Sequence, residues 1–305
     1  MSDYKVTILG SGSALSSIQT FHSAQMLKMN SKYFLIDAGE GVQIRLRQYH
    51  QKMLAINHIF ISHLHGDHCL GLPGLISSLG LMGRTAPLYI HAHPDLEKVM
   101  GEMIRYFCAD SPFEINFVSY NPHHSEEIFS DRTISVTTVP LKHRVPTCGF
   151  VFREKGKERH INRQMADAFE VPLAFYKNLK AGEDFVTPDG KVVENKRLTT
   201  EPSHAHSYAY ISDTAFLEKI VPLIEGVDCL YHEATFLSID QERIRKTLHS
   251  SAAQAAMIAQ MAHVGKLIIG HHSSRYSSYK PFIEEARAVF PETYSAEDGE
   301  RIDFQ

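Results

Sequence analysis

Residues 63–68, His-Leu-His-Gly-Asp-His, bring three imidazoles and one carboxylate into six positions. They directly follow the apolar run 59–62, which is typical of a buried strand, so these polar groups would be costly to bury without a partner. Imidazole nitrogens and carboxylate oxygens suit zinc or a similar divalent ion as ligands. Gly66 permits the sharp turn that lets ligands on both sides of it converge. The segment therefore predicts a metal site.

The number of ligands in this segment points to two ions. Four ligands at adjacent positions cannot all reach one tetrahedral ion, so two ions are expected, each with further ligands from elsewhere in the chain. Candidates that follow other apolar runs are His143, Asp213 and His271. Any one of them taken alone would more often be a structural or surface residue. Their shared position after expected strands favours a role as ligands.

The elements that must position these residues are short apolar runs that end in Gly, Asp or His. Such runs predict strands at residues 6–9, 33–36, 58–62, 88–90, 134–139, 208–211, 227–231 and 266–269. The clearest helix is expected at 252–262, where Ser251 and Gln254 form a capping box and Gly265 ends the pattern. Strands mixed with helices throughout indicate an α/β chain whose sheets are covered by helices.

Composition excludes several classes of protein. The 305 residues are 43% hydrophobic and 22% charged, which is enough for one large domain with its own core and argues against a disordered protein. A net charge of −4 argues against a general nucleic-acid binder unless a local basic patch exists. No apolar run approaches the roughly 20 residues that cross a bilayer, and residues 1–5 show no signal-peptide pattern. We therefore expect a cytoplasmic protein without a membrane segment.

The four cysteines are widely spaced and include no C-x-x-C pair: Cys69, Cys108, Cys148 and Cys229. This spacing argues against a zinc ribbon or a redox dithiol and fits a reducing compartment. We expect all four to be small buried side chains.

The segment from Arg153 to about Ser203 breaks the apolar pattern, and basic, Gly and Pro residues replace it. This change predicts an excursion from the core rather than a second full domain. Residues 153–163 carry five basic side chains against two acidic ones. A solvated surface loop is the plain interpretation of this charge run, and a basic patch for nucleic acid is the alternative.

The pattern H-x-H-x-D-H after a strand resembles the signature of the metallo-β-lactamase superfamily. That resemblance implies an α/β fold, a four-layer αβ/βα sandwich, with a two-metal site at the strand ends. A closer resemblance is to the short-form ribonuclease Z family, whose members cut the 3′ trailer from precursor tRNA and leave a 3′-hydroxyl on the tRNA. It rests on five motifs in matching order, at residues 34–43, 61–68, 71–75, 232–235 and 271–276.

The resemblance implies a role for each candidate ligand. His63, His65 and His143 would hold one zinc ion, Asp67, His68 and His271 the other, and Asp213 would bridge the two. The ions would activate a water for attack on phosphorus, with Asp67 part of the catalytic centre. The same ligands also suit Mn²⁺, Fe or Co²⁺.

Proton transfer is also implied by the resemblance. Glu233 would orient His249, and His249 would donate a proton to the leaving 3′ oxygen. His249 also stands just before the expected 252–262 helix, whose N-terminus favours a phosphate. For Asp37 and Glu40, a structural role and a substrate contact remain equal alternatives.

For the basic segment, the resemblance implies a flexible arm at 153–193, inserted in a single domain 1–305, that protrudes and clamps precursor tRNA. Implied substrate contacts are Arg153, Lys155, Lys157, Arg159, Arg163, Lys177, Lys180 and Arg275. Contacts with phosphates would be independent of base sequence and sensitive to salt. The family commonly forms homodimers in which the arm of one subunit serves the site of the other, and we expect the same here.

Two departures from the family pattern limit what can be carried over. Leu173-Ala174 stands where the arm usually has Gly-Pro. Residues 16–21 read Ser-Ser-Ile-Gln-Thr-Phe where many members have a basic loop that discriminates against tRNAs ending in CCA. That discrimination therefore cannot be carried over to this chain.

Two other functions remain as alternatives. A phosphodiesterase or lactonase could act on a small molecule with the same scaffold, although the arm and the His-Glu-Ala-Thr motif at 232–235 speak against it. A metal-loaded RNA-binding module without turnover is disfavoured because no ligand position is missing.

Overall fold

A computed structural model describes residues 3–15 and 20–304 of the chain. Residues 16–19, which include most of the loop that departs from the family pattern, lie outside the described residues. The chain divides into two compact units, which we describe in turn. The first consists of Met1–Arg153 and His206–Gln305, and the second of Glu154–Ala205.

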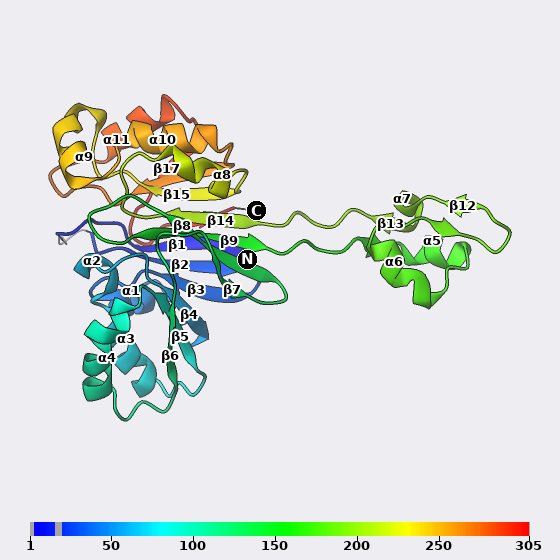
Figure 1. The fold of residues 1–305 in the computed structure, drawn as a ribbon, viewed down its shortest axis with the longest axis horizontal. Coiled ribbons are helices and arrows are strands. Elements are labelled where there is room, and N and C mark those ends of the chain that lie inside the picture. Colours follow the sequence, from blue (N-terminus) through cyan, green and yellow to red (C-terminus); the bar gives the residue numbers. More distant parts are fainter. Residues whose placement is uncertain (1–2, 16–19, 305) are drawn as a thin grey trace. The chain divides into compact units, whose positions relative to one another are not determined.

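Within its described residues, the first unit contains two seven-stranded sheets (Figure 1). The first sheet has the order β18 (Arg301–Asp303), β1 (Tyr4–Gly10), β2 (Ala24–Met29), β3 (Lys32–Ile36), β4 (Ile56–Phe60), β5 (Leu88–Ala92) and β6 (Ile115–Ser119). The second has the order β17 (Thr293–Ser295), β16 (Lys266–Gly270), β15 (Cys229–Glu233), β14 (Ser207–Ile211), β9 (Cys148–Glu154), β8 (Ile134–Pro140) and β7 (Glu127–Ser130). All eight expected strands are confirmed.

The helices of this unit are α1 (Val42–Gln48), α2 (Gly66–Cys69), α3 (Leu72–Leu81), α4 (Asp95–Phe107), α8 (Val221–Ile224), α9 (Gln241–Thr247), α10 (Ala252–Met261) and α11 (Lys280–Arg287). Short 3-10 turns occur at Met53–Ala55, Glu218–Ile220 and Ser238–Asp240. The helix expected after Ser251 is confirmed. Gln254 N donates to Ser251 Oγ at 3.2 Å, and Ser251 N donates to Gln254 Oε1 at 3.0 Å, which makes the capping box.

Apolar side chains on both faces of the central strands create the layers. On β9 and β14, Phe150 and Tyr210 belong to the core between the two sheets, whereas Val151 and Ala209 belong to the core under the helices. Successive side chains of a strand point to opposite faces, so strands that are apolar on both sides must be covered on both sides. Figure 1 shows α1, α3 and α4 over one sheet and α10 and α11 over the other.

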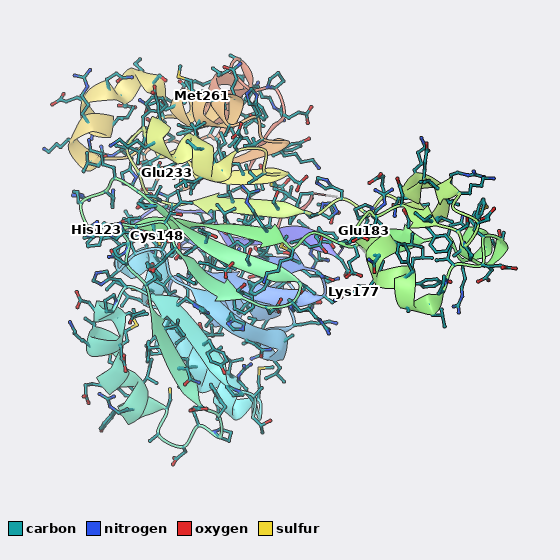
Figure 2. All side chains as sticks on the ribbon, turned by 45° about the vertical axis from the view of Figure 1, so that its right-hand side comes forward. His123, Cys148, Lys177, Glu183, Glu233 and Met261 are labelled. Atoms are coloured by element: carbon teal, nitrogen blue, oxygen red, sulfur yellow. The ribbon has the colours of Figure 1, made fainter. Side chains whose placement is uncertain are left out.

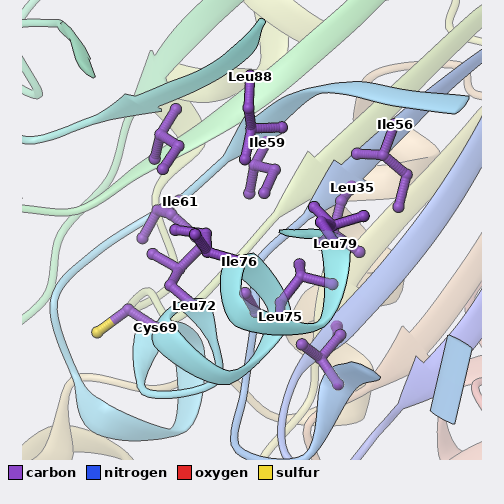
Figure 3. Packing of buried hydrophobic residues seen from close by; sticks show 14 of the residues in the cluster. Leu35, Ile56, Ile59, Ile61, Cys69, Leu72, Leu75, Ile76, Leu79 and Leu88 are labelled. Carbon is purple, nitrogen blue, oxygen red and sulfur yellow. The ribbon is translucent and has the colours of Figure 1, made fainter. Parts of the chain in front are cut away.

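Figure 3 shows how one helix covers the first sheet. Helix α3 packs against the strands through residues on one face, namely Leu72, Leu75, Ile76 and Leu79. On the strands, Leu35, Ile59 and Leu88 belong to the same core cluster. The resulting order of helix, sheet, sheet and helix is the predicted four-layer αβ/βα sandwich, which is confirmed.

The second unit holds β10 (His160–Ile161), α5 (Arg163–Ala168), a 3-10 turn (Leu173–Phe175), α6 (Tyr176–Lys180), β11 (Phe185–Val186), β12 (Val192–Val193), α7 (Asn195–Leu198) and β13 (Thr199–Thr200). It has a small core of its own, made of Ala166, Val171, Leu179, Phe185, Val193 and Leu198. The Asn195 amide ties the segment together by donating to the carbonyls of Leu179 and Glu183, both at 2.8 Å. This unit carries Lys177 and Glu183, which Figure 2 labels.

The four cysteines are buried and unpaired, as predicted. In the part of the chain that the structure describes, no helix combines the length and the apolar character that a bilayer span requires.

Candidate metal centre

The seven expected ligands come from the ends of four strands. His63, His65, Asp67 and His68 follow β4, His143 follows β8, Asp213 follows β14 and His271 follows β16. The structure gathers them in two groups, and within each group the ligand atoms lie within 4.8 Å of one another. One group is His63, His65, His143 and Asp213, and the other is Asp67, His68 and His271.

Asp213 lies between the two groups. Its Oδ1 is 3.4 Å from His271 Nε2 and 3.6 Å from His68 Nε2. Its Oδ2 is 3.6 Å from His63 Nε2 and 3.8 Å from His143 Nε2. Each carboxylate oxygen therefore faces one half of the site, which is the arrangement a bridging ligand requires.

The donor set fits divalent ions. Metal–ligand bonds of 2.0–2.1 Å in a tetrahedron place ligand atoms about 3.3–3.4 Å apart, close to the spacings around Asp213. Among the described residues, three buried atoms at the centre have no hydrogen-bond partner, namely His68 Nε2, His143 Nε2 and Asp213 Oδ1. Buried polar atoms are almost always satisfied, so these orphaned atoms indicate a cation between them.

Four of the expected histidine ligands are held in place by a contact of Nδ1, the ring nitrogen that faces away from the centre of the site. The Nδ1 contacts are His63 to Ser62 Oγ at 3.0 Å, His68 to Asp37 Oδ2 at 2.7 Å, His143 to Leu248 O at 3.1 Å and His271 to Thr235 Oγ1 at 3.0 Å. Each contact aims Nε2 at the centre, as in metal sites whose histidines are fixed by an outer partner. His65 differs because its Nδ1 faces His63 Nε2, 3.1 Å away.

Asp37 supports the site from below rather than contacting substrate. It is completely buried and accepts hydrogen bonds from Ser62 N at 2.7 Å, Ser62 Oγ at 2.9 Å and Tyr210 OH at 2.7 Å, in addition to that of His68. Glu40 is exposed and does not line the cavity at the site. Of the two roles considered for Asp37, a structural role and a contact with substrate, its burial and hydrogen bonds favour the structural one.

Two residues at the site have a left-handed backbone. Asp37 has φ of 56° and His271 has φ of 59°. This region is uncommon for residues other than glycine, and such strained conformations concentrate at functional sites. In both cases the turn follows a strand directly and aims the side chain toward the metal ligands.

The electrostatics of the site keep its carboxylates ionised. Burial would raise the pKa of Asp67, but His68 and His271 hold it well below the usual value. Burial likewise opposes ionisation of Asp213, but His271, His68 and His63 hold its pKa well below the usual value. Carboxylates must be ionised to bind a metal, so this balance suits ligands.

Glu233 and His249 form a buried pair beside the ligands. Glu233, at the end of β15 (Figure 2), accepts hydrogen bonds at Oε1 from His249 Nδ1 and Ser250 N, both at 2.9 Å. Its Oε2 accepts from Thr235 N at 2.9 Å and Thr235 Oγ1 at 2.8 Å. Burial would lower the pKa of His249, but the Glu233 carboxylate raises it to about 9.

Leu248 links this pair to the predicted metal ligand His143. It ends α9 in the left-handed region, with φ of 59°. Its carbonyl accepts the hydrogen bond from His143 Nδ1, and the next residue is His249. Sequence reasoning missed Leu248, because a backbone carbonyl leaves no signal in the residue type.

A cavity of about 670 Å³ opens at the site. Asp67, His143, Asp213, His249 and His271 line it together with the predicted substrate contact Arg275. The lining also contains three cations that the sequence analysis did not single out, Arg144, Arg243 and Lys246. For Arg144 the position directly after His143 is a sequence signal, whereas Arg243 and Lys246 resemble the other exposed cations of α9.

The other predicted substrate contacts are not among the residues that line the cavity. Arg153 belongs to the first unit, where its guanidinium donates to Leu223 O and Glu225 O. The remaining six lie in the second unit. Three of these form ion pairs there, Lys157 with Glu154 at 3.0 Å, Arg159 with Glu201 at 2.7 Å and Lys180 with Glu158 at 3.0 Å. Lys155, Arg163 and Lys177 are exposed.

Comparison with known proteins places the chain in a class. Residues 4–159 match the family model described as Anti-Pycsar protein Apyc1. The structure is similar to the short form of human tRNase Z, with a TM-score of 0.72, 23% identity and 99% of both chains covered. It is also similar to a metallo-β-lactamase fold protein from Bacillus subtilis, with a TM-score of 0.69, 17% identity and 98% of both chains covered. The chain thus has the metallo-β-lactamase fold, with His/Asp clusters at the ends of its strands.

Sequence relatives identify the family within this class. The chain is 47% identical to ribonuclease Z of Parabacteroides distasonis over 302 residues, which cover 99% of both chains. It is 44% identical to ribonuclease Z of Phocaeicola vulgatus over 305 residues, which cover 100% of this chain and 99% of the relative. The chain belongs to the ribonuclease Z family.

Proposed function

We propose that this protein is a zinc-dependent endoribonuclease that removes the 3′ trailer from precursor tRNA and leaves a 3′-hydroxyl on the tRNA. Membership of the ribonuclease Z family supports the reaction and the substrate. The observation that carries the proposal is the position of Asp213, whose two oxygens each face one half of the ligand set, next to the Glu233–His249 pair.

Two zinc ions per chain account for the ligand set. His63, His65 and His143 would hold one ion, Asp67, His68 and His271 the other, and Asp213 would bridge them. Bound there, the ions supply Lewis-acid stabilisation of the phosphate oxygens and lower the pKa of a bound water toward 7. Nitrogen and oxygen ligands in tetrahedral spacing favour zinc, with Mn²⁺, Fe and Co²⁺ as alternatives for the same donors.

The chain's own residues supply the proton for the leaving group. Glu233 accepts from His249 Nδ1, which leaves Nε2 as the nitrogen available to the cavity. Nε2 donates its proton to the 3′ oxygen as the bond from phosphorus to that oxygen breaks. Positioned general acids of this kind contribute typically 10²–10⁴-fold to rate.

The second unit would act as an arm that binds tRNA away from the scissile bond. Its cations suit phosphates of folded RNA; they include the exposed Lys155, Arg163 and Lys177, together with Lys157, Arg159 and Lys180, which form ion pairs within the unit. Such contacts would be salt-sensitive and would read tRNA shape rather than bases. In this proposal the arm occupies residues 153–193 of a single domain 1–305.

A homodimer and a cytoplasmic location complete the proposal. Helix α4 exposes an apolar stripe of Val99, Met103, Tyr106 and Phe107, and an exposed apolar face of this kind suits a second copy of the chain. A solution mass of twice 34.5 kDa by light scattering would support the dimer, and a mass of 34.5 kDa would refute it. The buried unpaired cysteines fit the reducing cytoplasm.

Three substrates in parallel test the function. The metal-loaded protein should cut a 3′-extended tRNA once, in addition to any hydrolysis of bis(p-nitrophenyl) phosphate. Hydrolysis of a lactone or of the small phosphodiester without cleavage of the tRNA would favour a small-molecule hydrolase on the same scaffold. Binding of the tRNA with no hydrolysis of any substrate would favour an RNA-binding module.

A further inference from the structure

Three cations line the cavity close to His249. Arg144 directly follows the proposed ligand His143, and α9 contributes Arg243 and Lys246. Residues three apart lie on the same face of a helix, so Arg243 and Lys246 project together. Lys246 is only three residues before His249. The cations thus come from the two segments that surround the proposed acid.

Two of these cations, Arg144 and Lys246, are not neutralised by a partner in the described part of the protein. Among the described residues, the side chains of Arg144 and Lys246 form no ion pair or hydrogen bond, and Arg243 only approaches Asp240, with Nε 3.7 Å from Oδ1. The chain as a whole carries a net charge of −4. Two cations without a partner and a third in a long ion pair, all around one cavity of an acidic protein, indicate an anionic ligand at that place.

The three cations lie on the side of the cavity where the proposed proton donor, His249, lies. Burial and the charge of Arg144 both lower the pKa of His249, against the raising effect of Glu233. The rings of His143 and His249 have centroids 4.9 Å apart. Arg144 is therefore a close neighbour of the group that protonates the leaving oxygen.

The chemistry of the reaction fixes which RNA segment lies on that side. Hydrolysis breaks the bond between phosphorus and the 3′ oxygen, and water supplies the oxygen that joins phosphorus. One proton of the water passes to solvent, the proton of His249 goes to the 3′ oxygen, and His249 regains a proton from solvent. The nucleotide that carries this oxygen is the last nucleotide of the tRNA, so the tRNA lies on the His249 side and the trailer on the opposite side.

We propose that Arg144, Arg243 and Lys246 form a phosphate-binding rim for the tRNA strand on the 5′ side of the scissile bond, and that this rim sets the direction in which the RNA enters the site. The inference rests on the proposed function. Guanidinium groups bind phosphate oxygens in pairs and an ammonium acts as a point charge, so the rim suits consecutive phosphates of the acceptor strand. The trailer makes no contact with it.

Binding of the two reaction products separates the two sides. One probe is an RNA hairpin with the acceptor stem, ending at the cleavage site in a 3′-hydroxyl, and the other is a single-stranded trailer with a 5′-phosphate. Fluorescence anisotropy measures the Kd of each for the metal-loaded protein at several salt concentrations. The variants are Arg243→Ala with Lys246→Ala, and Arg144→Gln. Arg245→Ala is the matched control, because Arg245 is an exposed cation of α9 that does not line the cavity.

For the rim variants, the Kd of the hairpin should rise about tenfold or more, because charge-assisted hydrogen bonds are lost. For the double variant, the slope of log K against log salt should become shallower by about 1.5, since each phosphate contact accounts for about 0.7–0.9. The trailer Kd should change less than twofold in all variants, and Arg245→Ala should match the wild type. Metal content and circular dichroism check the fold of each variant.

A rise in the trailer Kd alone would place the cations on the wrong side and overturn the proposal. Equal weakening by Arg245→Ala would overturn it too, because only net charge would then matter, and so would unchanged hairpin binding. Failure of the proposed function is a different result, namely no cleavage of precursor tRNA by the wild-type protein.

Discussion

Glu233 Oε1 and His249 Nδ1 lie 2.9 Å apart, in a pair whose carboxylate is completely buried and accepts four further hydrogen bonds from Thr214, Ser250 and Thr235. A buried carboxylate that is this fully satisfied fixes the orientation of the ring bonded to it. The second nitrogen of His249 is then the only one free to exchange a proton with a substrate. This geometry makes the role of His249 testable apart from metal binding.

His249→Ala should lower kcat for precursor tRNA on the order of 10²–10⁴-fold, the usual range for a general acid. The metal content should stay at the wild-type value, because His249 is not one of the seven proposed ligands. A phosphodiester with a p-nitrophenyl leaving group should recover much of the rate, since that group needs no proton. Loss of metal together with activity would make His249 a structural support instead. His123→Ala, at an exposed position, is the control.

Asp213→Ala should lower the metal content from about two ions per chain, because both halves of the site lose a ligand. Elemental analysis of the purified protein gives the ratio. Asp189→Ala, an exposed carboxylate of the second unit, should bind metal like the wild type. A ratio of one in the wild type that Asp213→Ala leaves unchanged would exclude the dinuclear centre.

Removal of the second unit should separate binding from chemistry. Arg153 and Ser207 are paired across β9 and β14, so a short glycine turn can replace residues 154–205 without displacing either strand. The loss of phosphate contacts made equally in ground and transition states should raise KM for precursor tRNA steeply and weaken its salt dependence. Hydrolysis of bis(p-nitrophenyl) phosphate should persist.

If a folded, metal-loaded deletion variant processes precursor tRNA normally at moderate salt, the second unit does not act as a tRNA-binding arm. Loss of both activities in such a variant would instead mean that the second unit helps to build the active site, for example across a dimer.

A histidine pair away from the metal site should make stability depend on pH. His58 Nδ1 and His91 Nε2 lie 3.1 Å apart, and burial lowers the pKa of His58 to about 4 and that of His91 to about 3. In the unfolded chain both would titrate near 6.5, so the unfolded state binds more protons below that pH. The contribution of the pair to stability is therefore complete above about pH 6.5 and is lost as the pH falls toward 4.

Urea unfolding of the wild type and of a His58→Phe, His91→Leu variant at pH 7.5, 6 and 5 checks this. The variant should lose less stability between pH 7.5 and 5 than the wild type, whereas His123→Gln should follow the wild type. Parallel curves for the wild type and the double variant would show that the pair does not carry the effect.

The sequence predicts the strands and the main capped helix well, because buried strands such as 208–211 are continuous apolar runs and Ser251 and Gln254 have a local signature. It also predicts the convergence of Asp213 and His271, since both follow strands of one sheet. It does not predict the carbonyl of Leu248 beside His143, which depends on a left-handed backbone and on contacts far apart in the sequence.

Other features lack a sequence signal for different reasons. The core of the second unit around Leu179 and Phe185 has no helical or strand period, so residues 153–203 look like a solvated loop. The basic residues Arg243 and Lys246 resemble those of any exposed helix. Only the cavity next to them distinguishes them from Arg245.

The most direct test of the account is the chemistry of the ends that the metal-loaded protein leaves on a precursor tRNA labelled at both termini. The proposed geometry, with His249 protonating the 3′ oxygen, predicts a single internal cut that yields a tRNA ending in a 3′-hydroxyl and an intact trailer that begins with a 5′-phosphate. A ladder of shortened trailers, or a tRNA that ends in a 3′-phosphate or a cyclic phosphate, would contradict it.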